Sequence, residues 1–218
     1  MSARRPIPSL TEEQAALQAG HCIIAGVDEA GRGTWAGPVA AAAVVLPLHR
    51  LHALAALDGV RDSKTLTPRA REKLEPRIIE AASSVGFGLA SAAEIDAIGI
   101  LPATRLAMSR AIGSLSTRAD FLLIDAVRLP KLQICQKSIV HGDALCLSVA
   151  AASIVAKVRR DRLMAELDGL FPGYGFAQHK GYGTARHWAA LHGLGPCPIH
   201  RRTFAPVRDV LTKENADR

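Results

Sequence analysis

Hydrophobic positions in this chain fall into two patterns: short apolar runs bounded by turn residues or charges, and longer stretches of helical length. The short runs are typical of buried strands, and the longer stretches are typical of helices. Strands are therefore predicted over 23–27, 39–46, 84–91, 120–125 and 132–140. Helices are predicted over 11–20, 67–83, 102–115, 145–167 and 184–192, with short helices opening at Ser91 and following residue 207.

Local signals indicate where several of these helices begin. Thr67, which is followed by a proline, fits an N-cap, and Ser91 with Glu94 forms a capping box. Pro76 lies inside the helix predicted over 67–83 and is expected to kink or split it. The 218 residues are enough for one sizeable core, so the pattern predicts a single domain of the α/β class.

Two adjacent carboxylates, Asp28 and Glu29, stand where the first predicted strand ends. Neighbouring side chains of a strand point to opposite faces, so both acids can serve one site only where the strand ends or bulges. Gly31 and Gly33 supply that ending, and Arg32 between them is a forked hydrogen-bond donor suited to phosphate. A polar turn is the plain alternative, whereas a divalent metal beside a phosphate needs this whole combination.

Two further acids, Asp125 and Asp143, also follow apolar runs that resemble strands. Ligands of open α/β sheets collect beyond strand ends, so we expect these acids to join Asp28 and Glu29 in one catalytic site. Clustered carboxylates repel one another unless cations neutralise them, and ligands made of oxygen alone select Mg²⁺ or Mn²⁺ rather than zinc. Two such ions about 3.5–4 Å apart are the usual device for in-line hydrolysis of a phosphodiester.

The basic residues are concentrated in the last third of the chain. The formal net charge is +7, and the segment from Lys157 to Arg208 holds nine Lys or Arg but three acids. A basic region that binds a polyanion, together with an acidic metal site, is what a phosphodiester-cutting enzyme needs. Lys180 and Arg201 are the residues predicted to contact phosphate. A generally basic, solvated surface is the alternative.

Composition also narrows the function class and the location. The cysteines lie far apart and are predicted to be buried free thiols (Cys22, Cys135, Cys146, Cys197), and the eight histidines show no zinc pattern. No apolar run approaches the roughly 20 residues of a membrane-spanning helix, and no apolar segment near the N-terminus marks the chain for export. A cytoplasmic, monomeric enzyme without membrane contact is expected.

Several stretches together carry a resemblance to a known family. They are DEAGRG at 28–33, AGPV at 36–39, LLID at 122–125, GD at 142–143, AAASIVAKV at 150–158, HKGYGT at 179–184 and HRRTFAPV at 200–207. In this order they resemble bacterial ribonuclease HII, a type 2 ribonuclease H. The resemblance implies a ribonuclease H-like mixed sheet flanked by helices. The resemblance extends from about Ile23 to Val207. Residues 1–20 are expected to be a lead-in and 21–218 the catalytic domain, with a basic helical C-terminal part from about 184.

The resemblance also implies roles for particular residues. The metal site would be formed by Asp28, Glu29, Asp125 and Asp143, and the ribonucleotide would be recognised by Gly31, Arg32, Gly33 and Tyr182. The implied reaction is endonucleolytic cleavage of RNA in RNA–DNA hybrids and at single ribonucleotides in duplex DNA, leaving 5′-phosphate and 3′-hydroxyl ends, as in ribonucleotide excision repair. A glycine often follows the third acid in the family and a lysine often precedes the Gly-Asp pair. Here these positions hold Ala126 and His141.

Two other function classes stay open at this point. A non-catalytic binder of RNA–DNA hybrids would keep Arg32 and Tyr182 but would have no use for four acids. Another ribonuclease H-like nuclease, such as a transposase or junction resolvase, would share the acids but cut DNA without a 2′-hydroxyl. Smaller alternatives concern the DSK element at 62–64, which either contacts nucleic acid or forms a surface turn. Tyr182 either reads the ribonucleotide or packs under the following helix.

Overall fold

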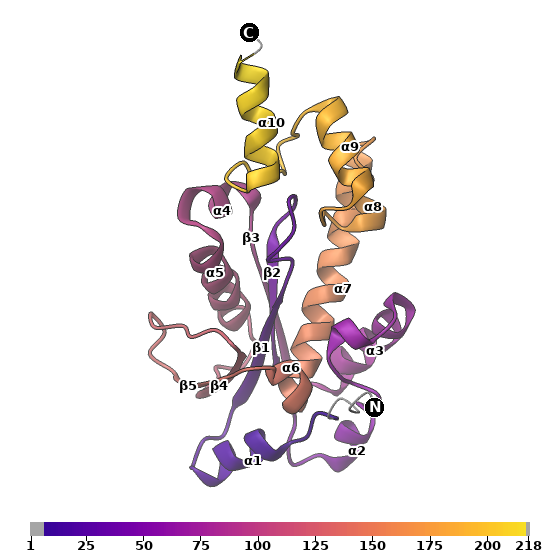
Figure 1. Cartoon of the computed structure of the whole chain (residues 1–218). Coiled ribbons are helices and arrows are strands. Elements are labelled where there is room, and N and C mark those ends of the chain that lie inside the picture. Colours follow the sequence, from indigo (N-terminus) through magenta and orange to yellow (C-terminus); the bar gives the residue numbers. More distant parts are fainter. Residues whose placement is uncertain (1–6, 217–218) are drawn as a thin grey trace, which may run out of the picture. The chain divides into compact units, whose positions relative to one another are not determined.

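The structure, a computed structural model, describes residues 7–216. One sheet has the strand order β3-β2-β1-β4-β5 (Figure 1). Its strands are β1 (Ile24–Ala30), β2 (Val39–Val45), β3 (Ser84–Ala90), β4 (Phe121–Asp125) and β5 (Cys135–Ile139). β1 pairs antiparallel with β2, whereas β1, β4 and β5 run parallel. The predicted mixed sheet is thus confirmed.

Helices precede, separate and follow these strands in the chain. They are α1 (Thr11–Gln18), α2 (Leu51–Ala55), α3 (Pro68–Ala81), α4 (Ala92–Ile98), α5 (Ile100–Gly113), α6 (Gly142–Leu145), α7 (Leu147–Leu170), α8 (Phe176–His179), α9 (Ala185–Leu194) and α10 (Ala205–Ala216), with a 3₁₀ turn η1 (Ser63–Thr65). The short elements α2, α6, α8 and η1 were not predicted, because so few residues show no hydrophobic period.

The capping signals are confirmed. The Thr67 side chain accepts a hydrogen bond from the N–H of Ala70 at the start of α3, and the capping box at Ser91 opens α4. α3 continues through Pro76 to its end, so the proline does not split the helix. α9 runs to Leu194, two residues beyond the predicted end.

The core lies on both faces of the sheet. β2 contains only valine and alanine, and every one of its residues is buried. Ala42 and Val44 of β2 pack with buried residues of α3 and α7, while α5 lies on the opposite side of the sheet (Figure 1). Gly26 of β1 allows α7 to approach closely, because a Cβ at this position would collide with the Ser148 carbonyl carbon. This contact fixes the start of α7 against the strand that carries the acidic pair.

The chain divides into two compact units, each assembled from three separate segments. Unit 1 comprises residues 1–30, 40–89 and 105–158, and unit 2 comprises residues 31–39, 90–104 and 159–218. Unit 1 contains most of the sheet and the core just described. Unit 2 has its own core, in which Met164, Tyr174 and Phe176 pack together, and a second cluster around Leu191 and Val207.

The segment that the sequence assigns to a lead-in belongs to unit 1. The buried Glu13 carboxylate of α1 accepts hydrogen bonds from the N–H and the Oγ of Ser148, at 2.8 and 2.7 Å. α1 is therefore tied to the first turn of α7. Residues 1–6 of the predicted lead-in, and residues 217–218 of the predicted C-terminal part, lie outside the described residues.

The cysteines differ in part from the prediction. All four are free, but Cys22 and Cys135 are exposed, Cys197 is half-buried and Cys146 is buried. Cys22 precedes β1 and Cys135 begins the edge strand β5, so neither position is covered by neighbouring strands on both sides. Within residues 7–216, no helix combines the length and the apolar character that crossing a membrane requires.

Candidate active site

Three aspartates from separate elements of unit 1 meet at one place. Asp28 lies near the end of β1, Asp125 is the last residue of β4, and Asp143 lies in the short helix α6 that follows β5. The parallel register pairs Val27 with Ile124, which brings the next residues on both strands, Asp28 and Asp125, side by side. One carboxylate oxygen of each aspartate lies within 4.8 Å of those of the other two.

Glu29 follows Asp28 on β1 and is half-buried. Its N–H donates a hydrogen bond of 2.7 Å to Asp28 Oδ1. Its carboxylate is not one of the three that share the 4.8 Å cluster in the described part of the chain. The structure therefore brings together three of the four predicted acids, with the fourth adjoining them in the chain.

The backbone after β5 orients two of the aspartates. The N–H of Gly142, in the first turn of α6, donates a hydrogen bond of 2.8 Å to Asp125 Oδ1. The next residue is Asp143, whose exposed fraction is 3%. One turn of helix thus both holds the Asp125 carboxylate and delivers the Asp143 carboxylate.

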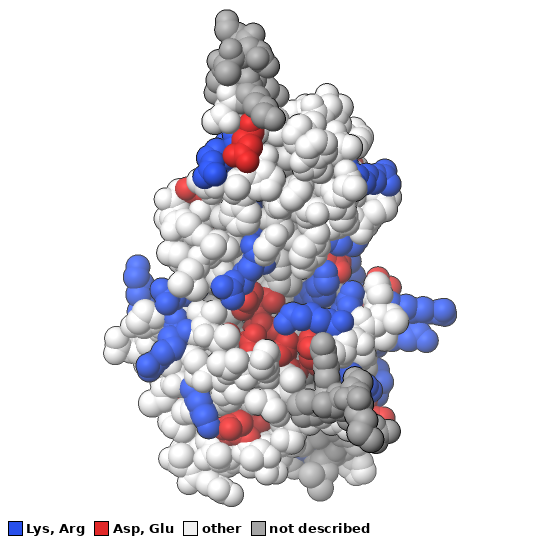
Figure 2. All heavy atoms as spheres, viewed as in Figure 1, with Lys and Arg blue, Asp and Glu red and all other residues white. Residues whose placement is uncertain are grey.

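The electrostatics of the cluster favour a bound cation. Burial raises the pKa of Asp28 well above its ordinary value, and the charges of Glu29 and Asp125 raise it further. Burial also raises the pKa of Asp125, with a contribution from Asp143. Figure 2 shows a cluster of acidic atoms near the middle of the displayed face, with smaller acidic patches elsewhere. Buried carboxylates this close together have the oxygen-only donor set that suits a hard divalent ion, so these residues fit Mg²⁺ or Mn²⁺.

Lys64 also reaches the acidic cluster. Its Nζ lies 2.9 Å from Asp143 Oδ2, although 71% of its side chain is exposed. Partial burial lowers the pKa of Lys64, but the hydrogen bond to Asp143 and the negative charges around it outweigh this effect and raise it overall. Asp62 shapes the turn by accepting a hydrogen bond from the Lys64 N–H, and Ser63 is buried. Neither open interpretation of the DSK element included this contact with an acid.

The Gly31-Arg32-Gly33 turn follows β1 and belongs to unit 2. Arg32 and Gly33 are exposed, whereas the carbonyl groups of Gly31 and Arg32 accept hydrogen bonds of 2.6 and 2.7 Å from Arg201. Arg201 also donates to the Gly37 carbonyl and is 0% exposed. Because its guanidinium is buried and bound to carbonyl groups, the prediction that Arg201 contacts phosphate is wrong. The residue instead fixes the shape of the turn.

A second buried arginine, Arg160, binds two loops of unit 2. It donates to the carbonyl groups of Pro38 and Lys180, at 2.9 and 3.0 Å, and to Thr34 Oγ1 at 2.9 Å. Burial lowers the pKa of Arg160. Burial likewise lowers the pKa of Arg201, to about 9. The two guanidinium groups therefore bind the backbone of the loops that carry Arg32 and Tyr182.

The Lys180-Gly181-Tyr182-Gly183 segment lies in unit 2. Tyr182 is 42% exposed. Lys180 is half-buried, with left-handed backbone (φ 55°), and its Nζ donates to the Asp161 carbonyl at 3.1 Å. A Cβ at Gly183 would collide with the Trp35 ring. This glycine therefore allows the indole to pack against the segment. Tyr182 is exposed rather than packed under α9.

Comparison with known proteins agrees with this arrangement. The family model for ribonuclease HII matches residues 25–207. A ribonuclease HII from Chloroflexus aggregans is 54% identical over 94% of this chain and 96% of its own length, and one from Dehalococcoides mccartyi is 52% identical over the same shares. The chain belongs to the ribonuclease HII family. Members of this family are ribonuclease H endonucleases that act on RNA–DNA hybrids and depend on divalent metal.

Solved structures support the same fold for this ribonuclease HII homologue. The crystal structure of ribonuclease H2 from Pyrococcus horikoshii superposes with a TM-score of 0.75 at 28% identity, over 89% of this chain and 99% of that one. A ribonuclease HIII in complex with Mn²⁺ superposes with a TM-score of 0.69 at 20% identity, over 93% of this chain and 73% of that one. The predicted ribonuclease H-like fold is confirmed.

The two departures of this ribonuclease HII homologue from the family pattern have an unusual backbone in common. Ala126 has φ 51° and His141 has φ 59°, and both values lie in the left-handed region that favours glycine. Ala126 directly follows Asp125, and His141 directly precedes Gly142. A glycine at position 126 would adopt this backbone without steric strain.

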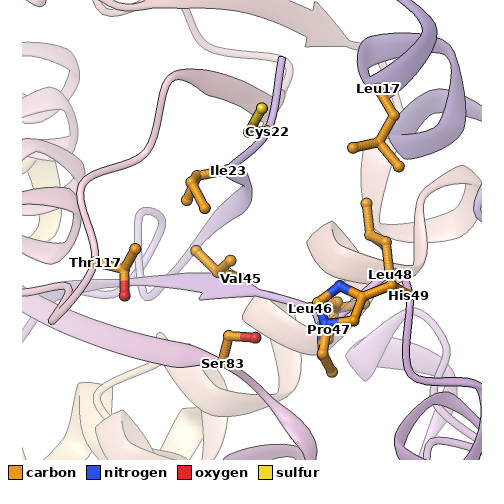
Figure 3. A pocket seen from close by; sticks show the side chains of 10 residues that line it. All are labelled: Leu17, Cys22, Ile23, Val45, Leu46, Pro47, Leu48, His49, Ser83 and Thr117. Carbon is orange, nitrogen blue, oxygen red and sulfur yellow. The ribbon is translucent and has the colours of Figure 1, made fainter. Parts of the chain in front are cut away.

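A cavity of about 200 Å³ in unit 1 lies apart from this chemistry (Figure 3). Its walls are mainly apolar and include Leu17, Ile23 and Val45, with the Cys22 thiol beside them. None of the four acids lines it. The acidic cluster, rather than this cavity, is therefore the candidate active site of the ribonuclease HII homologue.

Proposed function

We propose that this protein hydrolyses the RNA strand of RNA–DNA hybrids and also cuts duplex DNA at single embedded ribonucleotides. The observation that carries the proposal is the 4.8 Å cluster of Asp28, Asp125 and Asp143 oxygens, in a chain of the ribonuclease HII family. The proposed products carry 5′-phosphate and 3′-hydroxyl ends. Such an activity suits the removal of ribonucleotides from DNA, which we propose as its role, carried out by a cytoplasmic monomer.

Asp28, Glu29, Asp125 and Asp143 are the residues that would hold two divalent ions, Mg²⁺ or Mn²⁺. When bound, such ions activate the attacking water and stabilise the leaving oxygen of an in-line displacement. The structural neighbour that contains Mn²⁺ is a ribonuclease HIII and supports this choice by its fold alone. Asp28 has a raised pKa because it is buried among acids, so it must lose its proton before it can serve as a ligand.

Lys64 has a place in the same chemistry. Its ammonium balances the charge of Asp143 at 2.9 Å, and most of its side chain is exposed. An ammonium on a flexible stem can leave a carboxylate for a phosphate, because both offer oxygen acceptors. We propose that Lys64 leaves Asp143 when substrate binds and that its ammonium then contacts the phosphate next to the cleaved bond.

Unit 2 supplies the groups that distinguish RNA from DNA. At a single nucleotide this distinction rests on the 2′-hydroxyl, and a site built to hydrogen-bond that group strongly rejects substrates that lack it. The exposed ring of Tyr182 offers a flat surface for a sugar, with a hydroxyl at its tip. The Gly31-Arg32-Gly33 turn, whose shape Arg201 fixes through two carbonyl groups, is assigned to the same recognition through its backbone N–H groups.

Three labelled duplexes test the proposal: an RNA–DNA hybrid, a DNA duplex with one ribonucleotide, and the same duplex made only of DNA. We expect cleavage of the first two in Mg²⁺ or Mn²⁺ and none of the third. Asp125→Asn should abolish cleavage while hybrid binding persists, and Asp58→Asn, at an exposed acid of unit 1, is the matched control. Cleavage of the all-DNA duplex would assign the protein to another nuclease class. Cleavage of the hybrid alone would restrict the function to hybrids.

A second measurement tests the proposed role of Tyr182 in recognising the ribonucleotide. Tyr182→Ala should lower the single-turnover rate at one embedded ribonucleotide sharply without changing the melting temperature, because the ring is exposed. Tyr182→Phe separates the ring from the hydroxyl. Wild-type rates from a folded Tyr182→Ala would remove Tyr182 from the recognition site.

A further inference from the structure

Three buried histidines surround the backbone of Tyr182 in unit 2. The exposed fractions of His179, His187 and His200 are 9%, 0% and 1%. The Nε2 atoms of His187 and His200 face each other at 3.0 Å. Two ring nitrogens at this distance form a hydrogen bond only when one of them carries a proton and the other does not. One histidine of the pair must therefore donate and the other accept, and the contacts at their other ring nitrogens determine which does which.

The contacts at the far nitrogens fix that direction. The backbone N–H of Cys197 donates to His200 Nδ1 at 3.0 Å, so Nδ1 is the acceptor and the proton of a neutral His200 is on Nε2. His187 Nε2 then accepts this proton, which leaves the proton of His187 on Nδ1. That nitrogen lies 3.0 Å from the Tyr182 carbonyl oxygen, to which it donates. One chain of hydrogen bonds runs from Cys197 through both rings to Tyr182.

The third histidine holds the other side of the same segment. His179 Nδ1 accepts from the Gly181 N–H at 3.2 Å, so its proton is on Nε2, which donates to the Tyr174 carbonyl at 2.8 Å. The carbonyl of His179 accepts from the Tyr182 N–H at 2.9 Å. The rings of His179 and His187 stack with centroids 4.4 Å apart and an angle of 10° between them. Both backbone polar groups of Tyr182 are thus bound to this histidine cluster.

We propose that His179, His187 and His200 are positioning residues that hold Tyr182 in place through a fixed order of neutral tautomers. The inference rests on the proposed function of Tyr182 as the ribonucleotide reader. The histidines do not touch substrate; they anchor the buried backbone while the ring of Tyr182 stays exposed. Protonation of His187 would place two N–H donors opposite each other at the facing pair. Protonation of His200 would do the same at its Nδ1, which faces the N–H of Cys197, so either event breaks the chain.

The surroundings of the pair keep it neutral. Burial, and to a lesser extent the neighbouring histidines, lowers the pKa of both His187 and His200 to about 4. The titratable groups in contact with the pair are His179, Cys197, whose Sγ lies 3.1 Å from His200 Nδ1, and Tyr174, whose ring lies 5.0 Å from that of His200. The ring of the buried Phe176 packs against all three histidines.

Long-range ¹H–¹⁵N NMR of the full-length protein at pH 8 tests the tautomers directly. We expect the Nδ1–H form of His187 and the Nε2–H forms of His179 and His200 at pH 8, with the forms of His187 and His200 retained at pH 6. The Nε2–H form of His187, or an imidazolium at His187 or His200 at pH 6, would overturn the proposal. This measurement needs no substitution at any of the three positions, so it remains decisive if variants fail to fold.

Two substitutions of one residue test the positioning role. Asn at position 187 places an amide near the former Nδ1 and keeps the donor to Tyr182, whereas Gln places its amide near the former Nε2 and loses that donor. His187→Asn should retain the single-turnover rate at one embedded ribonucleotide within about threefold. His187→Gln should lower it tenfold or more, because small misplacements of a binding group are costly. His192→Asn, at an exposed histidine of the same helix, is the control.

Thermal melts accompany these rates. Equal rates in the two folded variants would overturn the proposal, because a merely structural role would not distinguish the amide positions. Tyr182→Ala in the same assay separates this outcome from a failure of the proposed function. If Tyr182→Ala cleaves normally, Tyr182 does not recognise the ribonucleotide and the proposed function of this residue fails. If Tyr182→Ala is impaired but His187→Gln is not, only the positioning role of the histidines is refuted.

Discussion

Asp28→Asn should make the metal-free protein more stable while it destroys catalysis. Asp28 is 3% exposed and shares a 4.8 Å cluster with two other aspartates. Asparagine has the same shape, and its Oδ1 can still accept the hydrogen bond from the Glu29 N–H that Asp28 accepts at 2.7 Å. The substitution therefore removes charge, with little change in packing.

The size of the effect follows from Coulomb's law. At the 4.8 Å limit, with an effective dielectric constant of about 20, two ionised carboxylates repel each other by about 3.5 kcal/mol. Retained protons reduce this repulsion, as the raised pKa of Asp28 indicates, and the ammonium of Lys64 offsets part of it. We expect a net stabilisation of about 2 kcal/mol, which corresponds to a rise of roughly 4–8 °C in Tm for a chain of this size.

The assay is thermal unfolding at pH 8 in EDTA and again in Mg²⁺, for wild type, Asp28→Asn and the control Asp58→Asn. Asp28→Asn should melt higher than wild type in EDTA and lose this advantage in Mg²⁺, since the ion stabilises the wild-type cluster. Cleavage should be undetectable. A folded Asp28→Asn that melts below wild type in EDTA would refute the electrostatic reasoning, and one that still cleaves would remove Asp28 from the site.

Three further predictions concern the supporting structure. Arg201→Lys should destabilise the protein by about 3 kcal/mol in urea unfolding, because lysine cannot replace the guanidinium that binds three carbonyl groups. Hybrid binding by this variant should weaken with salt as steeply as binding by wild type. A weaker dependence on salt would indicate that Arg201 contacts phosphate after all. Ala126→Gly should raise the unfolding free energy by about 1 kcal/mol, since φ is 51°; an unchanged or lower value would show no strain there. His187 and His200 have a pKa of about 4 in the folded protein and about 6.5 in the unfolded chain, so the free energy of unfolding should fall as the pH drops from 6.5 to 4, by up to about 3 kcal/mol for each histidine. Urea midpoints that stay constant from pH 7 to pH 5 would contradict this.

The strands and the acids at their ends were predictable from the sequence because their signals are local. An apolar run that ends on a carboxylate marks both the strand and the edge where its acid lies, as for Asp28 and Asp125. The same reasoning predicted Asp143, although a turn of helix rather than the strand delivers it. The association of these acids needed only the rule that parallel strands end at one edge of a sheet.

Residues whose role depends on distant partners could not be assigned in this way. Arg201 and Arg202 are adjacent in the chain, yet Arg201 is buried and Arg202 exposed. Charge and spacing do not distinguish them, because the carbonyl groups that bind Arg201 lie far away in the chain. Lys64 was noted for its motif, but its contact with Asp143 links residues 79 positions apart. Only the folded chain shows which basic residues face solvent and which bind protein.

The order in which the ribosome makes the chain limits when the Gly31-Arg32-Gly33 turn can gain all of its contacts. Arg201 is made 170 residues after Gly31, whose carbonyl it binds. At about 5–20 residues per second, roughly 10–30 s pass between the two. All segments of unit 1 have been made once Val158 is in place, whereas unit 2 still lacks its longest segment. A nascent chain can therefore assemble its acidic cluster first, whereas the Gly31-Arg32-Gly33 turn gains its contacts with Arg201 only later.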